Sequence, residues 1–358
     1  MQDVSYAQIY AWDNLLHAYR KAAKGKRHRE AAARFQFRLE DNLVHLQKEL
    51  ADQHYQPGPY DSFFVHDPKR RLISAAPFRD RVVHHALCTI IEPMFERGFI
   101  HDSYANRVGK GTHAALQRAQ EFSRRFKYVL PCDIRQFFPS IDHALLRTVL
   151  ARRIKDLDIL ALIDSILYSG AGLLREMYSM VYFSGDDLFA ALRPRGLPIG
   201  NLTSQFWANC YLDPVDHFVK RELRCKGYVR YVDDMLLFGD SKKELWAWKR
   251  SLMKRLADMR LTIHVRRAQV NPTRIGFPFL GFVVFPRRFR LKRRKGIAYR
   301  RRFRQMAVDY RNGLIPLSAV AASVRGWAVH AAFGDTEGLR RAVLSSTVFV
   351  RPSREGLK

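Results

Sequence analysis

Two adjacent aspartates inside an apolar stretch are the residues of this sequence best suited to chemistry. Asp233 and Asp234 lie within GYVRYVDDMLLFGD (residues 227–240), where aromatic and aliphatic residues precede and follow them. This pattern predicts two short strands around a tight turn, which would project both carboxylates into one place. Adjacent carboxylates repel each other unless a cation is present, which points to a divalent metal. The alternative is a surface turn with two solvated aspartates, the commoner interpretation of an isolated pair.

A third carboxylate favours the metal site. Asp133 ends the apolar segment KYVLPCDI (residues 127–134), which predicts a buried strand. An aspartate at the end of a strand is more often a helix cap or a turn residue. Together with Asp233 and Asp234, however, it completes the carboxylate set that two-metal phosphoryl transfer requires. In that chemistry two Mg²⁺ ions about 3.5–4 Å apart activate the attacking hydroxyl and stabilise the leaving pyrophosphate.

The order of these motifs resembles the catalytic palm of a reverse transcriptase. The resemblance begins with Asp133-Ile134-x-x-Phe137-Phe138, followed downstream by Tyr231-x-Asp233-Asp234. Other segments resemble parts of the same family in the same order: a fingers motif (68–83), a second motif (103–115), the loop and helix that hold the templating pair (196–209) and the primer grip (276–285). The resemblance thus runs across nearly the whole chain.

Among reverse transcriptases of the group II intron and retron-like bacterial kind, the sequence most resembles the diversity-generating retroelement group. Three segments carry this resemblance: Ile199-Gly200-x-x-x-Ser204-Gln205, NLLHAYRKAAKGKR (14–27) and GWAVHAAFGDT (326–336). Some bacterial anti-phage defence reverse transcriptases share parts of the pattern, so a defence enzyme with a dedicated non-coding RNA is one alternative. An inactive RNA-binding protein on the same fold is another.

The resemblance implies roles for individual residues. The catalytic and metal-binding residues would be Asp133, Asp233 and Asp234, and Ile134 would add a backbone carbonyl. Phe138 would be a steric gate that stands where the 2′-hydroxyl of a ribonucleotide would go, the alternative being ordinary core packing. Further residues expected at the incoming nucleotide or the templating pair are Lys69, Arg71, Ile199, Gly200 and Gln205.

Two departures from the family pattern affect the expected chemistry. Ile199 stands where related enzymes usually have Gln, so the pocket lacks a hydrogen-bonding side chain and low fidelity is expected. Misincorporation opposite template adenines is implied by the subgroup alone. In segment 261–270, where related enzymes often have a proton-donating Lys, this chain has Arg266 and Arg267. Arginine is a poor acid, so the general acid stays unassigned.

The charge of the chain predicts a polyanionic partner. Its 358 residues include 62 Lys and Arg against 34 Asp and Glu, a net charge of +28. The segment 287–304 holds eleven Lys and Arg and no acid, with Phe289, Tyr299 and Phe303 interleaved. This composition suits contact with the backbone of a template–primer duplex. Basic residues expected to contact nucleic acid are Arg79, Arg81, Arg107, Lys110, Arg293, Arg294, Lys295, Arg301 and Arg302, although Asp80 could neutralise either of its neighbours.

Several protein classes are excluded by composition. The four cysteines are scattered without a C-x-x-C pair, so neither a disulfide scaffold nor a zinc ribbon is indicated. No apolar run of about 18 residues and no secretory signal is visible, so we expect a cytoplasmic protein without a membrane partner. By composition alone, a ribosomal-type binding protein fits as well as an enzyme.

The expected elements place these motifs in an α+β fold, a right-hand polymerase with fingers, palm and helical thumb. We expect an N-terminal extension and fingers (1–125), a palm (126–285, with an insertion at about 141–198) and a basic helical thumb (286–358). Helices are expected at 39–50, 80–92, 141–168, 200–224, 241–260 and within 296–348. Strands are expected at 62–66, 127–134, 227–240 and 276–285, and an irregular or hairpin segment at 173–195.

The sequence therefore predicts an RNA-directed DNA polymerase that copies a structured template RNA into cDNA with two Mg²⁺ ions, for which Mn²⁺ could substitute. Its expected partners are the template RNA, the RNA–DNA hybrid, dNTPs and a small basic oligomeric accessory protein. No stretch is left for an RNase H or endonuclease domain, so strand removal and integration are expected to come from other proteins.

Overall fold

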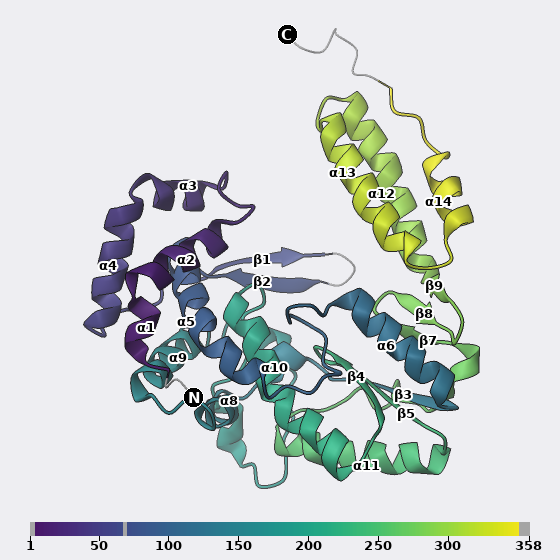
Figure 1. Ribbon diagram of the computed structural model, residues 1–358, viewed down its shortest axis with the longest axis horizontal. Coiled ribbons are helices and arrows are strands. Elements are labelled where there is room, and N and C mark those ends of the chain that lie inside the picture. The colour runs from purple at the N-terminus through teal and green to yellow at the C-terminus, as the bar shows by residue number, and fades with distance from the viewer. Residues whose placement is uncertain (1–3, 67–69, 351–358) are drawn as a thin grey trace.

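The computed structural model describes residues 4–66 and 70–350, and it combines helices with three small antiparallel sheets (Figure 1). The central sheet has the strand order β4-β5-β3-β6. A two-stranded hairpin, β1-β2, and a three-stranded sheet, β7-β8-β9, complete the set. The strands are β1 (Asp61–Val65), β2 (Arg71–Ala75), β3 (Tyr128–Asp133), β4 (Gly227–Tyr231), β5 (Asp234–Gly239), β6 (Asn271–Pro272), β7 (Phe277–Phe279), β8 (Phe282–Val284) and β9 (Phe289–Leu291). The expected α+β class is confirmed.

Helices α6 and α11 pack on the central sheet, and the last helices of the chain form a separate C-terminal group. An N-terminal group, α1 to α4, packs on the long helix α5, as Figure 1 shows at its left. The helices are α1 (Tyr6–Tyr10), α2 (Trp12–Ala23), α3 (Glu30–Phe37), α4 (Leu39–Ala51), α5 (Phe78–Glu96), α6 (Thr112–Arg125), α7 (Phe137–Ser140), α8 (His143–Ala151), α9 (Leu157–Ser169), α10 (Leu202–His217), α11 (Lys242–Asp258), α12 (Arg293–Arg311), α13 (Leu317–Ala332) and α14 (Glu337–Leu344).

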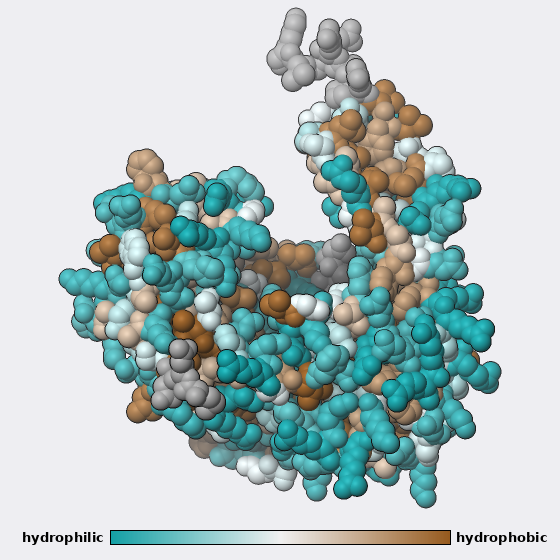
Figure 2. Space-filling model, in the orientation of Figure 1, coloured by the Kyte–Doolittle hydropathy of each residue, from teal (hydrophilic) through white to brown (hydrophobic). Residues whose placement is uncertain are grey.

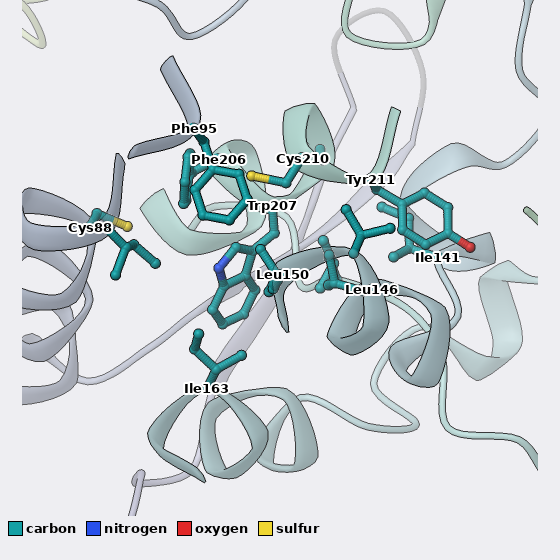
Figure 3. Packing of buried hydrophobic residues seen from close by; sticks show 14 of the residues in the cluster. Cys88, Phe95, Ile141, Leu146, Leu150, Ile163, Phe206, Trp207, Cys210 and Tyr211 are labelled. Atoms are coloured by element: carbon teal, nitrogen blue, oxygen red, sulfur yellow. The ribbon is translucent and has the colours of Figure 1, made fainter. Parts of the chain in front are cut away.

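Helix α10 runs through the middle of the largest hydrophobic core. Trp207 and Tyr211 are among its largest fully buried side chains, and they pack with residues of α5, α8 and α9 (Figure 3). A helix that is buried on nearly all sides lacks the one-sided apolar stripe of a surface helix. Its hydrophobic side chains therefore fix α10 as a central support against which the flanking helices pack.

The C-terminal helices α12, α13 and α14 form a separate small core. Tyr299 and Phe303 are buried in it, and the ring of Tyr299 stacks on that of Trp327 with centroids 4.2 Å apart. Trp327 thus belongs to the core of this helical group. Figure 2 shows an open hollow between the α12–α14 group and the N-terminal helical body.

Three helical expectations differ from the structure. The expected helix 141–168 is two helices, α8 and α9, because Asp156 caps a new helix by accepting hydrogen bonds from the amides of Asp158 and Ile159. The expected helix 200–224 ends as α10 at His217 and continues as a π-helical turn, Phe218–Glu222. Helix α5 begins at Phe78, after Pro77, and ends at Glu96, so it is longer at both ends than the expected helix 80–92.

The segment expected to be irregular, 173–195, matches expectation more closely. Residues 173–195 contain only two short 3₁₀ turns, Arg175–Met177 and Leu188–Leu192. The buried carboxylate of Asp186 attaches this segment to Arg260, just after α11, with Nη1–Oδ1 at 2.6 Å. Among the residues described, no helix is long and apolar enough to cross a bilayer.

Candidate active site

The antiparallel register of the central sheet brings the three predicted aspartates together. Asp133 at the end of β3 lies directly opposite Asp234 at the start of β5. Directly opposed residues of an antiparallel pair project to the same face, so the two carboxylates share one side of the sheet. Asp233 lies in the two-residue turn between β4 and β5, and its carbonyl accepts a hydrogen bond from the amide of Ile134 at 3.3 Å. The expected hairpin is therefore confirmed.

The donor chemistry of this corner suits a hard divalent cation. The side chain of Asp133 is 35% exposed, and Asp233 and Asp234 are half-buried. Mg²⁺ prefers oxygen ligands, retains several waters and is often held by one or two carboxylates plus substrate phosphates. Across residues 4–66 and 70–350, no group of three or more Asp, Glu, His or Cys side chains is arranged so that it could hold a metal ion by itself. The residues present therefore fit an ion whose remaining ligands come from water and substrate.

His264 lies beside Asp133, a neighbour that the sequence around Arg266 and Arg267 did not predict. Residues 261–264 run alongside the end of β3, and the amide of His264 donates to the carbonyl of Asp133 at 2.9 Å. Nε2 of His264 lies 3.9 Å from Oδ2 of Asp133, whereas both arginines are exposed. The alternation of buried Leu261 and Ile263 was the available signal for an extended segment here.

Phe138, for which the sequence leaves open a steric gate or ordinary core packing, follows a more deeply buried ring, Phe137. Phe137 is buried in the main core, and Phe138 is half-buried at the start of α7 and packs against the same core. The carbonyl of Phe138 accepts a hydrogen bond from the amide of Leu197 at 3.0 Å. Phe138 is thus held near the loop that precedes α10, and its role as a steric gate remains a prediction.

The loop of Ile199 and Gly200 is attached to the strand β2. The amide of Ser74 donates to the carbonyl of Ile199 at 2.9 Å, and the side chain of Asn201 binds the carbonyl of Ser74 and the amide of Ala76. Gly200 has a φ of +120°, and a Cβ added to it would lie 3.0 Å from Cγ2 of Ile73. Glycine is therefore required here by the backbone conformation and by the neighbouring strand.

Two other residues expected at the nucleotide are exposed to solvent. Gln205 is exposed on the first turn of α10, and Arg71 is exposed at the start of β2. Lys69 lies outside the described residues. These positions are compatible with contact to a nucleotide, and the contacts themselves remain predictions.

Comparison with known proteins decides the family. Residues 66–284, more than half of the chain, match the family model "Reverse transcriptase (RNA-dependent DNA polymerase)". The chain belongs to the reverse transcriptase family.

Relatives of this reverse transcriptase include bacterial proteins. Protein YkfC of Escherichia coli is 26% identical over 226 residues, which cover 61% of this chain and 52% of YkfC. The group II intron-encoded protein LtrA of Lactococcus lactis is 26% identical over 183 residues, 50% of this chain and 28% of LtrA. The chain thus spans about half or less of the length of these relatives. A telomerase structure from Candida albicans aligns with a TM-score of 0.44 and 10% identity, covering 84% of this chain and 58% of that one.

Several basic residues expected to contact nucleic acid are engaged within the reverse transcriptase itself. Arg79 forms ion pairs with Glu49 and, at 3.7 Å, with Asp80. The side chain of Arg107 is only 6% exposed and pairs with Glu96 at 2.7 Å while donating to two backbone carbonyls. Contrary to expectation, the structure therefore places Arg107 as an internal support.

Two further cations, Arg81 and Lys110, are also engaged within the protein, and the ammonium of Lys110 lies over the ring of Tyr104, 5.1 Å from its centroid. Nε of Arg81 donates to the carbonyl of Ala76 at 2.7 Å, and Nζ of Lys110 donates to the carbonyl of His101 at 3.0 Å. Both side chains are only partly exposed. Asp80, which the sequence suggested could neutralise Arg81, instead accepts hydrogen bonds from the hydroxyl of Tyr55 and the amide of Gly58.

The cations of the C-terminal helical group point outward, in contrast to its aromatic residues. Tyr299 and Phe303 face the internal core, so they are not available for stacking on bases. A cavity of about 580 Å³ lies between β8, β9 and the start of α12, lined by Arg290, Lys292 and neighbouring arginines. The exposed predicted residues on α12 are Arg293, Arg294, Lys295, Arg301 and Arg302.

Proposed function

We propose that this reverse transcriptase extends a primer 3′-hydroxyl with dNTPs along an RNA template. The observation that carries the proposal is the register that sets Asp133 opposite Asp234, with Asp233 in the adjoining turn. Asp133 and Asp233 would hold the metal ions, with Asp234 and the carbonyl of Ile134 alongside. When bound, two Mg²⁺ ions, or Mn²⁺ in their place, activate the hydroxyl and stabilise the departing pyrophosphate.

The protein's own residues would select and orient the reactants. The half-buried ring of Phe138 would exclude a 2′-hydroxyl, and exposed Arg71 would bind the triphosphate. The loop of Ile199 and Gly200, fixed to β2, would support the templating pair. The outward cations of α12 would bind the backbone of the RNA–DNA hybrid without reading its sequence.

Primer extension on an RNA template tests the activity. Wild type should extend the primer with dNTPs, and Asp233→Ala should not. Asp258→Asn, at the exposed end of α11, is a matched control that should leave extension unchanged. Failure of the wild type on every template would favour the inactive RNA-binding alternative.

We further propose that the enzyme is the error-prone polymerase of a diversity-generating retroelement, acting in the cytoplasm on a structured RNA with a small basic accessory protein. Ile199 supports low fidelity because it offers no hydrogen bond to a base. Sequencing the products of wild type and Ile199→Gln on one RNA template tests this account. Identical error spectra would refute it.

A phage-defence role is the competing proposal, and the nucleic acid bound to the protein separates the two. RNA and cDNA that co-purify with the protein should be sequenced. A template matching a variable repeat of a target gene favours the retroelement, and a dedicated non-coding RNA favours defence.

A further inference from the structure

A fully buried arginine lies directly behind the catalytic turn. The side chain of Arg230 on β4 is 1% exposed and that of Asp216 near the end of α10 is 0% exposed. Nε of Arg230 lies 2.8 Å and 2.9 Å from the two carboxylate oxygens of Asp216, and Nη2 lies 2.7 Å from Oδ2. The pair is thus a close, multiply hydrogen-bonded ion pair in the protein interior.

The remaining donors of this guanidinium reach other segments of the palm. Nη1 donates to Oδ1 of Asn209 at 3.1 Å, and Nη2 donates to Oγ of Ser103 at 3.3 Å. The backbone amide of Arg230 donates to the carbonyl of Asp102 at 2.9 Å. One side chain therefore joins α10, β4 and the loop that precedes α6.

The decisive contact is to the turn itself. Nη1 of Arg230 also donates to the carbonyl of Val232 at 3.2 Å, which belongs to the peptide bond that leads into Asp233. Val232 has a φ of +54°, a left-handed conformation that is unusual for a β-branched residue. Such conformations persist only where the surroundings hold them, and they gather at functional sites.

Fold stability alone does not account for this ion pair. Taking two charges out of water is costly, and replacing a buried pair by well-packed apolar residues is often neutral or stabilising. A planar guanidinium offers five donors in fixed directions, which an apolar side chain cannot supply. The ion pair therefore fixes the direction from which the guanidinium donates a hydrogen bond to the carbonyl of Val232.

We propose that Arg230, held by Asp216, is a positioning residue that fixes the Val232–Asp233 peptide and so presents the carboxylate of Asp233 beside Asp133. This inference rests on the proposed polymerase function. Because α10 begins just after Gly200 and carries Asp216 near its end, one helix supports both the loop of the templating pair and the catalytic turn.

Tyr228 provides a control within the same network. Its hydroxyl donates to Oδ1 of Asp216 at 2.8 Å, so Tyr228→Phe removes a buried hydrogen bond from the same carboxylate. Arg230 and its bond to the turn are retained in that variant. A purely structural role of the network predicts similar effects of substitutions at both positions.

A pair of substitutions separates stability from positioning. Arg230→Met leaves Asp216 buried without its cation and should lower the melting temperature. Combining it with Asp216→Leu removes both charges and should restore much of the melting temperature. The double variant still lacks the donor to Val232, so its kcat should remain about 100-fold below wild type, as for a small misplacement of a catalytic group.

The assays compare full-length proteins for kcat, for KM of dNTP and for affinity toward an RNA template–DNA primer duplex. For the double variant and for Arg230→Lys, we expect a loss in kcat with template–primer affinity within about twofold of wild type, because the contact acts at the turn alone. Tyr228→Phe should retain kcat. Recovery of kcat together with melting temperature in the double variant would overturn the proposal, as would an equal kcat loss in Tyr228→Phe.

A metal-binding assay separates failure of the positioning role from failure of the proposed polymerase function. Mn²⁺ binding is followed by electron paramagnetic resonance in full-length protein with duplex and a non-hydrolysable dNTP. Arg230→Lys should weaken Mn²⁺ binding in the same direction as Asp233→Asn, and Tyr228→Phe should not. If wild type binds Mn²⁺ and shows this pattern without polymerising, the proposed function fails and the positioning role stands. If Arg230→Lys binds Mn²⁺ like wild type, or wild type binds none, the positioning role fails.

Discussion

Removing the side chain of Asn201 is expected to loosen the attachment of the loop of Ile199 and Gly200 to β2. Asn201 is 3% exposed, and its amide group bonds to the carbonyls of Ser74 at 2.8 Å and Pro198 at 3.2 Å and to the amide of Ala76 at 3.0 Å. Ser74 and Ala76 are themselves buried, so Asn201→Ala leaves their backbone groups without these partners.

The expected magnitude follows from these contacts. Each hydrogen bond contributes about 1 kcal/mol net, and leaving a buried group unsatisfied costs about 1–3 kcal/mol. Because the amide of Ser74 keeps its bond to the carbonyl of Ile199, the loop should shift rather than unfold. We therefore expect the free energy of unfolding to fall by about 2–4 kcal/mol. The KM for dNTP should rise about tenfold, less than the loss that a full 1 Å misplacement can cause.

Urea unfolding measures the free energy of unfolding, and steady-state primer extension measures the KM for dNTP. Asn14→Ala is the matched control, because its side chain bonds to two backbone carbonyls, of Ile9 and Ala86, within the N-terminal helical body. It should lower stability by about 1–2 kcal/mol and leave the KM for dNTP unchanged. A normal KM in Asn201→Ala despite the stability loss would refute the link between β2 and nucleotide binding.

Three further predictions concern the sugar gate, the duplex and pH. Phe138→Ala should admit ribonucleotides, measured as the ratio of kcat/KM for rNTP and dNTP; an unchanged ratio would assign Phe138 to the core alone. Replacing exposed Arg301 and Arg302 by Gln should reduce the slope of log affinity for duplex against log salt concentration by about 2, and an unchanged slope would place the duplex elsewhere. Burial lowers the pKa of His84 to about 3, so the folded protein keeps it neutral while the unfolded chain takes up a proton below about pH 6.5. The contribution of His84 to the free energy of unfolding is present above that pH and is lost as pH falls toward 3, by about 1.4 kcal/mol per pH unit. In urea unfolding, His84→Phe should therefore lessen the loss of stability between pH 7 and pH 5. Substitution of the exposed His28 by Gln should not.

Local patterns in the sequence were sufficient to predict the β4–β5 hairpin and its partner strand β3. The apolar runs that flank Asp133 and the pair Asp233 and Asp234 specify strands whichever other elements surround them, and the structure confirms both. The broken helix at Asp156 was less accessible, because apolar residues continue on both sides of the cap and conceal the interruption. An N-cap aspartate can be recognised only when the helix start is suspected.

Contacts between distant segments could not be predicted from one sequence. Arg107 and Arg230 look like other arginines of a basic chain, and only the fold shows that both are buried. The partner of Arg230, Asp216, comes from another element, and its contact to Val232 depends on the exact turn. His264 was overlooked for the same reason, since its proximity to Asp133 arises from pairing across more than a hundred residues.

The central position of α10 limits where the length of this chain can vary. At about 1.5 Å and 100° per residue, one inserted residue in α10 would both lengthen the helix and rotate its far end, separating Asp216 from Arg230. The irregular segment 173–195 contains no α-helix whose length and rotation must be kept. Its residues Leu188 and Phe189 are 83% and 72% exposed. Natural length differences between relatives, and peptide tags placed within the chain by an engineer, should therefore be tolerated beside Leu188 and rejected within α10.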